Sequence, residues 1–260
     1  MRKKLLTILL TVFVFLSGAA LGISTVYCVD TVTVNVHYVT EEAKTEGAEL
    51  QVRLEEAYCG TNTFFAKQKT AEDVLKDYPY FRITDFEKSY PKRLVIDITE
   101  NAEVYAIEKT PDEEYYILSA DGVVLDVRDT HINRLNGEEN VILKGLDVSI
   151  EKGSVPKGDA CFTAVLSVCQ EFSTMLNGIR CNVVSVSLRN RTPEMVLVVT
   201  MREGVKIYFS NPTQLIKEKV EAALSEYDGL TDAEKTTGRI LVVENSGEIY
   251  PDYSSMDEFE

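Results

Sequence analysis

The sequence predicts an α+β protein with an N-terminal transmembrane helix, a small β-α-α-β-β module, and then an antiparallel-sheet domain with helices packed against it. Three observations lead to this fold class. Residues 5–29 form an uncharged, largely apolar run, several short segments alternate apolar and polar residues, and longer segments carry apolar residues at helical spacing. We therefore divide the chain into a cytoplasmic tail (1–4), a transmembrane helix (5–29), a first domain (30–101), a second domain (102–253) and a disordered acidic tail (254–260).

The N-terminal segment is long enough to span a bilayer with some tilt. Arg2, Lys3 and Lys4 precede it and are expected to stay in the cytoplasm, which leaves the rest of the chain outside. A cleaved signal peptide is the alternative, with an apolar core over residues 5–16 and small residues at 17–20. We favour the retained helix because the apolar character continues beyond a typical signal core.

The first domain begins with a strand, because valines alternate with polar residues over residues 32–36. A charged loop over residues 40–46 and a helix near residues 50–58 follow. A second helix is expected from Thr70, a hydroxyl cap that is followed by acids in the first turn.

A hairpin completes this module. Leu94, Ile96 and Ile98 alternate with more polar residues, which is typical of a half-buried strand. Pro91 begins the turn from a preceding, less regular strand. By Glu100 the module is complete, and we expect its two helices to cover one face of its sheet.

The second domain is rich in predicted strands. A hairpin is expected around residues 119–122, and a last strand over residues 240–244. Between them the patterns predict a helix (159–177), three antiparallel strands (183–188, 195–201 and 205–209) and a second amphipathic helix (212–227).

The chain is strongly acidic. Asp and Glu number 42 against 27 Lys and Arg, for a formal net charge of -15. This balance argues against binding nucleic acid, anionic lipid headgroups or anionic wall polymers, and is compatible with a basic partner. The alternative is a solvated acidic coat that keeps the protein soluble.

No catalytic, metal or cofactor site is predicted. Cys28, Cys59, Cys161, Cys169 and Cys181 form no Cys-x-x-Cys pair, and the chain has only two histidines. Disulfides outside the cell and buried free thiols are both open alternatives for these cysteines. Neither a Gly-x-Gly-x-x-Gly nor a Walker-type phosphate loop occurs.

Several motifs of the first domain occur in a recognisable order. They are the strand at 32–36, the helix near 50–58, Gly60-Thr61-Asn62-Thr63-Phe64, Pro79-Tyr80, the turn at Pro91 and a strand that ends at Glu100. This series resembles the polypeptide-transport-associated (POTRA) module at the membrane-proximal end of the FtsQ/DivIB family of bacterial cell-division proteins. The family usually continues with Glu-Arg, whereas this chain has Glu100-Asn101. Residues 119–125 are similar to the aspartate-glycine turn that opens the family's second domain.

The resemblance implies a non-enzymatic, single-pass membrane scaffold at the division septum, with its N-terminus in the cytoplasm and both domains outside the cell membrane. Its partners would be small coiled-coil bitopic proteins of the FtsB/DivIC and FtsL type, together with septal wall synthases. In the family the C-terminal part of the second domain receives the coiled-coil proteins. Such a scaffold would link septal wall synthesis to the membrane ring.

The last predicted strand is the candidate binding element. We expect it at a sheet edge, where unpaired backbone groups can accept an extended partner segment. Tyrosines that follow it would be good interface anchors. The alternative is that the strand simply completes the core. The predicted protein-binding residues are Ile240, Leu241, Val242, Val243, Tyr250 and Tyr253.

Two other functions remain as alternatives. Ser-x-x-Lys occurs at Ser89–Lys92 and Ser149–Lys152, which is compatible with an extracytoplasmic, penicillin-binding-like wall enzyme. The Ser-Asp-Asn partner of that motif is absent from the sequence. A transport component with the same small module is the other alternative, although the repeated modules and barrel pattern of such proteins are not visible in the sequence.

Overall fold

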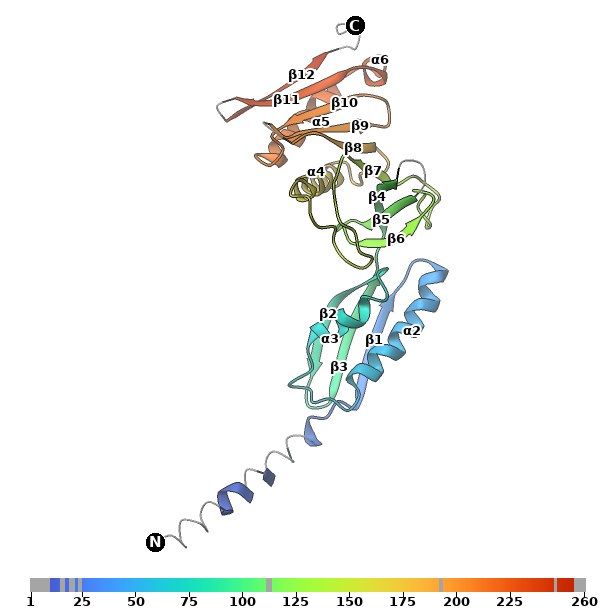
Figure 1. Ribbon diagram of the computed structural model, residues 1–260, viewed down its shortest axis with the longest axis vertical. Helices are drawn as coiled ribbons and strands as arrows, with labels where there is room; N and C mark the ends of the chain where they lie inside the picture. Colours follow the sequence, from blue (N-terminus) through green and yellow to red (C-terminus); the bar gives the residue numbers. More distant parts are fainter. Residues whose placement is uncertain are drawn as a thin grey trace, which may run out of the picture. The chain divides into compact units, whose positions relative to one another are not determined.

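The computed structural model separates into two compact units, residues 1–100 and 101–260 (Figure 1). The residues whose structure it describes are 10–14, 17–18, 22, 25–110, 114–191, 194–245 and 247–254. Of the predicted tails, residues 1–4 and 255–260 lie outside this part, and Ser254 is the last residue of a strand.

The predicted transmembrane helix is wrong. In the part of the chain that the structure describes, no helix is both long and apolar enough to cross a membrane. Part of the 5–29 run lies outside the described residues. The fold is therefore corrected to a mixed, sheet-rich α/β structure, and the single-pass membrane location inferred from that helix is withdrawn.

Residues 31–100 of the first unit, all of them described, form a three-stranded sheet with two helices (Figure 1). Its central strand β3 pairs in parallel with β1 and antiparallel with β2, so the sheet order is β1-β3-β2. α2 contacts β1 and α3 contacts β2. The elements are β1 (Thr31–His37), α2 (Glu41–Tyr58), α3 (Gln68–Leu75), β2 (Phe81–Ser89) and β3 (Arg93–Glu100).

Burial in β3 follows the alternation seen in the sequence. Leu94, Ile96 and Ile98 are fully buried, and Leu50 and Leu54 of α2 are buried with them. Since successive side chains of a strand point to opposite faces, these three residues face the helices while their neighbours face away. The predicted half-buried strand is confirmed.

Both helix starts differ from the prediction. α2 begins at Glu41, inside the segment predicted as a loop, and Thr40 caps it by accepting a 3.1 Å hydrogen bond from the Ala43 N–H. Glu100, at the end of β3, accepts hydrogen bonds from the Thr40 N–H and hydroxyl at 2.9 and 2.7 Å. A residue distant in sequence thus holds the start of this helix. α3 begins at Gln68, so Thr70 lies inside its first turn and is not the cap.

The second unit is a nine-stranded sheet in the order β12-β11-β10-β9-β8-β7-β4-β5-β6. Its strands are β4 (Glu103–Thr110), β5 (Glu114–Ser119), β6 (Val124–Arg128), β7 (Val141–Lys144), β8 (Val183–Asn190), β9 (Val196–Met201), β10 (Lys206–Ser210), β11 (Arg239–Asn245) and β12 (Glu248–Ser254). Its helices are α4 (Cys161–Met175), α5 (Ile216–Gly229) and α6 (Asp232–Thr236).

The prediction of an antiparallel sheet is only partly right. β8, β9 and β10 are antiparallel as expected, but β4 and β7, β7 and β8, and β10 and β11 pair in parallel. A helix lies between β7 and β8, and helices again lie between β10 and β11. Such a crossover returns the chain to the end of the sheet where it started, which makes the two strands parallel.

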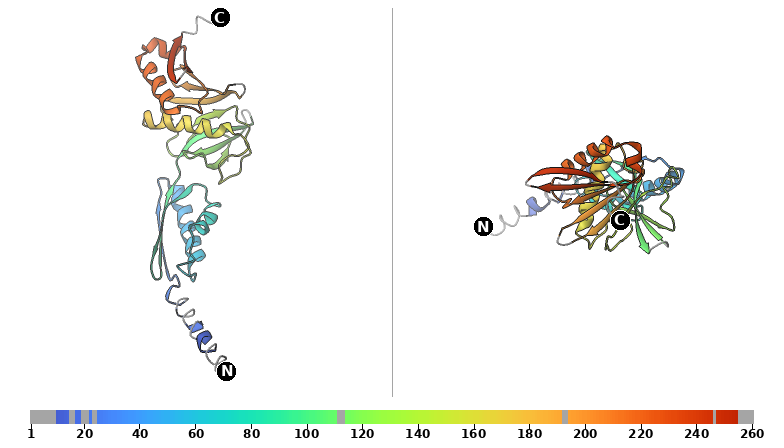
Figure 2. Two further views of the ribbon diagram at one scale, coloured as in Figure 1. Left: turned by 90° about the vertical axis from the view of Figure 1, so that its left-hand side faces the viewer. Right: turned by 90° about the horizontal axis from the view of Figure 1, so that it is seen from above.

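α4 and α5 lie on the same side of this sheet (Figure 2). α4 contacts β8, and α5 contacts β11, β12 and α4. Phe162, Val165 and Phe172 of α4 and Val220 and Ala223 of α5 belong to the buried core that they form with the strands. The sheet therefore has one helix-covered face, and the opposite face of β10–β12 carries the site described next.

Candidate protein-binding edge

β12 is the end strand of the nine-stranded sheet. It pairs antiparallel with β11, from Arg239 opposite Ser254 to Asn245 opposite Glu248. In the part of the chain that the structure describes, no strand pairs with the other side of β12. The sheet edge is thus formed by residues 248–254, whereas the sequence predicted it at residues 240–244.

The predicted binding residues of β11 divide between the two faces of the sheet. Ile240 and Val242 are fully buried in the core under the helices, which is the alternative outcome stated for this strand. Leu241 and Val243 lie on the opposite face, and Leu241 is 38% exposed. Of these four residues, only Leu241 and Val243 are placed to meet a partner.

The two tyrosines of β12 divide in the same way. Tyr253, opposite Ile240, packs against the core, and its hydroxyl donates a 3.1 Å hydrogen bond to the Thr237 carbonyl. Tyr250, opposite Val243, is 47% exposed on the open face. Tyr250 is therefore accessible from solvent, whereas Tyr253 serves mainly in packing.

An apolar surface on the open face was missed in the sequence. The register places Tyr208 of β10 beside Leu241. Together with Val243 and Tyr250, these side chains form what we call the open-face patch: Tyr208, Leu241, Val243 and Tyr250. Tyr208 gave no signal because its position on this face depends on the pairing of β10 with β11, and periodicity alone does not determine which strands are neighbours.

Pro251 restricts how the edge can pair. It lies opposite Val242 inside the β11–β12 ladder. A proline has no N–H, and in a paired strand it is tolerated where that N–H would face away from the neighbouring strand. We infer that the outer side of β12 lacks a donor at Pro251 and offers N–H groups at Ile249 and Tyr253 on either side of it.

The charged groups around the edge are mostly acidic. Glu248 and Asp252 are exposed on β12, on the same face as Tyr250. The Tyr250 hydroxyl donates a hydrogen bond to the Glu248 carboxylate, and this bond raises the pKa of Tyr250. Burial raises the pKa of Tyr253, with a smaller contribution from the charge of Glu234. Both phenols therefore stay neutral at physiological pH and act as hydrogen-bonding and apolar groups.

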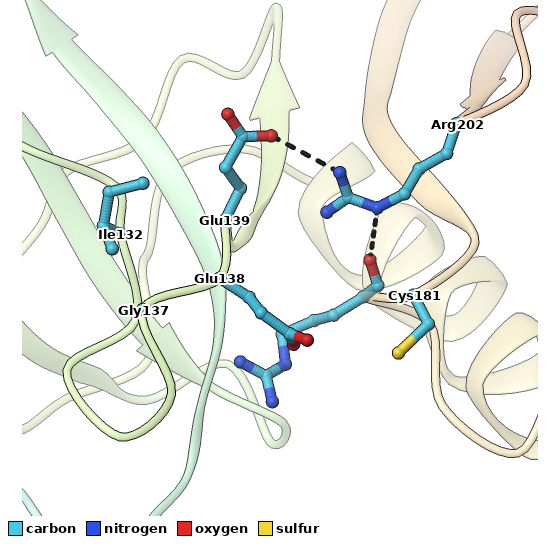
Figure 3. Close-up of a pocket in the computed structure, with 7 residues that line it drawn as sticks. Ile132, Gly137, Glu138, Glu139, Cys181 and Arg202 are labelled. Carbon is cyan, nitrogen blue, oxygen red and sulfur yellow. Dashed lines mark hydrogen bonds and ion pairs between the residues drawn. The ribbon is translucent and has the colours of Figure 1, made fainter.

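A cleft of about 500 Å³ lies elsewhere in the second unit, between the loop before β7 and the segments around α4–β8 and β9–β10 (Figure 3). Arg202 crosses it, donating a 2.8 Å hydrogen bond from Nε to the Arg180 carbonyl and reaching Glu139 at 3.4 Å. Cys181 also lines it and is exposed. The Arg202 guanidinium thus contacts one acceptor in each of two loops, the Arg180 carbonyl and the Glu139 carboxylate, and so links these loops.

The lysines of both Ser-x-x-Lys motifs bind carboxylates. Lys92 lies 3.4 Å from Asp30, and Lys152 lies 3.1 Å from Asp126. Ser149 pairs through its backbone with Lys157. A serine nucleophile needs its base within hydrogen-bonding reach. The contacts described for these two lysines are instead ion pairs with Asp30 and Asp126.

Comparison with protein-family models gives no match, and no curated protein matches the chain either.

Proposed function

We propose that this protein is a non-enzymatic scaffold of the bacterial division septum. In this role it binds small coiled-coil division proteins and septal wall synthases, and it links wall synthesis to the division ring. The observation that carries the proposal is β12, an end strand that lies beside the open-face patch. An edge strand offers main-chain hydrogen bonds to an extended segment, and adjacent apolar side chains add affinity and specificity.

Two further features support a scaffold. The first unit has the element order β1-α2-α3-β2-β3, which is the order expected of the small module that the sequence resembles. The arginine in the cleft and the lysines of both Ser-x-x-Lys motifs are each held by carboxylates or carbonyls of the protein itself. These contacts fit structural roles for those side chains.

Site-specific photo-crosslinking tests this function. The full chain is prepared with the photoreactive amino acid p-benzoylphenylalanine in place of Leu241 or Tyr250, and mixed with the coiled-coil division pair from the same genome. A matched control carries the probe at Phe65, which is 77% exposed in the first unit. We expect adducts with the coiled-coil pair from the two edge positions and none from Phe65.

The affinity of the same complex provides a second measurement. The double variant Leu241→Asp, Tyr250→Asp is expected to weaken binding by about 10-fold or more, because exposed aromatic and aliphatic anchors commonly dominate an interface. Phe65→Asp is expected to leave the affinity unchanged. If the coiled-coil pair is folded and yet neither binds nor forms adducts at the edge positions, the proposed function is wrong.

A further inference from the structure

The side chains of β12 determine what a strand added beside it would meet. On the open face these side chains are Glu248, Tyr250 and Asp252, in that order. On the helix-covered face they are Ile249, Pro251 and Tyr253, and Ile249 and Tyr253 pack against the core. Side chains on adjacent strands lie about 5 Å apart when directly opposite, so each of these positions selects its neighbour on the added strand.

On the open face of β12, one carboxylate lies on each side of an aromatic ring. Their cross-strand neighbours in β11 are uncharged: Asn245 lies opposite Glu248 and Leu241 opposite Asp252. Among the described residues neither carboxylate forms an ion pair, although Glu248 accepts the Tyr250 hydroxyl. Opposite charges placed directly across two strands stabilise the pair, and like charges destabilise it. An added strand is therefore favoured when basic residues lie opposite Glu248 and Asp252.

The surrounding chain reinforces this preference. Residues 216–254 contain nine Asp or Glu and four Lys or Arg. Three of the four bases are engaged within the protein, and one of them, Lys235, lies over the ring of Tyr227 at 4.7 Å. The Lys219 ammonium is buried and donates to the Ser210 and Asn211 carbonyls at 3.0 and 2.9 Å, and Arg239 donates to the Ser254 hydroxyl at 2.9 Å. The segment that contains the edge strand is thus net acidic, which favours a cationic partner over an anionic one.

Pro251 makes this charge preference matter more. Because the outer edge lacks a donor at its centre, a partner strand cannot form a continuous ladder along β12. Backbone pairing alone would also be non-selective, since every segment carries the same N–H and C=O groups. Side-chain complementarity must then supply much of the selectivity.

We propose that the segment received by β12 is a short basic strand with the pattern basic–apolar–apolar–apolar–basic. Its two Lys or Arg residues lie opposite Glu248 and Asp252, its central residue stacks beside Tyr250, and the remaining two face Ile249 and Pro251. The pattern is symmetric, so it holds for either strand direction. This inference rests on the proposed function, because it specifies the partner chemistry of the same edge.

Peptide binding to the full chain tests the inference. The probe is a fluorescein-labelled peptide with Lys-Val-Tyr-Val-Lys between Gly-Ser flanks, and its matched control has Glu in place of both Lys. We expect saturable anisotropy with the basic peptide, and at least about 10-fold weaker binding of the acidic one. Raising the salt concentration from about 0.05 to about 0.5 M should weaken the basic complex, because exposed charge pairs are screened.

Variants of the chain locate the effect. Glu248→Gln with Asp252→Asn removes both charges and keeps the shapes of the side chains, and we expect about 5-fold weaker binding of the basic peptide. Glu42→Gln with Glu56→Gln makes the same change in net charge on α2, where both residues are exposed, and should leave binding unchanged.

The outcomes separate this inference from the proposed function. Equal binding of the basic and acidic peptides, or an unchanged affinity of the Glu248→Gln, Asp252→Asn variant, would overturn the inference while leaving crosslinking of the coiled-coil pair at Tyr250 intact. Failure of both peptides to bind would overturn it as well. A concentration-dependent dimer in sedimentation that crosslinks through Tyr250 would show that a second copy occupies the edge, which also contradicts a basic partner strand.

Discussion

Asp159 is expected to make the stability of the second unit depend on pH in the acid range. Its side chain is 1% exposed and accepts a 2.7 Å hydrogen bond from Arg191 Nη1, together with backbone N–H bonds from Asp147 and Cys161 at 3.0 and 2.9 Å. Burial opposes ionisation of this carboxyl, but the three donors and the charge of Arg191 outweigh it and lower its pKa to about 2.

The size of the effect follows from that pKa. The difference between the ordinary value of 3.8 and about 2 corresponds to roughly 2.4 kcal/mol at neutral pH. Arg191 is 42% exposed, so solvent screening reduces this, and we expect Asp159→Asn to cost about 1–2 kcal/mol. Because the folded-state pKa is depressed, the contribution is present above about pH 4 and is lost as the pH falls through about 2.

The assay is urea unfolding followed by far-UV circular dichroism between about pH 2 and pH 7. Pulsed hydrogen exchange of peptides from α4 assigns the transition to the second unit. Asp126→Asn is the matched control, since Asp126 pairs with Lys152 near the surface of the same unit and should contribute less than about 0.5 kcal/mol. A free-energy difference between wild type and Asp159→Asn that stays constant from pH 7 to pH 2 would refute the reasoning.

Three other predictions follow from single residues. Glu100→Ala should lower the free energy of unfolding by about 2 kcal/mol and increase hydrogen exchange in the first turn of α2, because it leaves the donors at that helix start unpaired. Unchanged exchange would show that the carboxylate is dispensable. Gly204→Ala should lower the melting temperature by several degrees, because Gly204 has φ of 125° and an added Cβ would overlap the Thr236 carbonyl oxygen; a melting temperature equal to wild type would contradict this. Iodoacetamide at neutral pH should modify exposed Cys181 quickly and Cys169 only after unfolding, since Cys169 is fully buried and burial raises its pKa. Equal modification rates of the two thiols by mass spectrometry would disprove this prediction.

Local patterns predicted the elements whose burial repeats at a regular period. Leu94, Ile96 and Ile98 alternate in β3 and are buried, and α4 buries Phe162, Val165 and Phe172 at helical spacing. These predictions succeeded because each depends only on which side chains of one segment face apolar surroundings. The apolar run near the N-terminus, by contrast, predicted a membrane helix that the described part of the chain does not contain.

The edge of the sheet was placed one strand too early for an identifiable reason. β12 contains a proline and alternates exposed with partly buried residues, so its sequence lacks the strong β signal of β11. Prolines are nevertheless accepted in edge strands. Pro251 thus weakened the strand signal in the sequence, and it also removes a hydrogen-bond donor from the outer side of β12.

The sequence by itself determined which segments become strands and helices over most of the two units, the acidic charge, and the presence of tyrosines after β11. Only the tertiary structure decided that β12 ends the sheet, that three strand pairs of the second unit are parallel, and that Tyr208 lies beside Leu241. The physical reason is that periodicity records how one segment partitions between core and solvent, whereas strand order and direction depend on contacts between residues far apart in the chain.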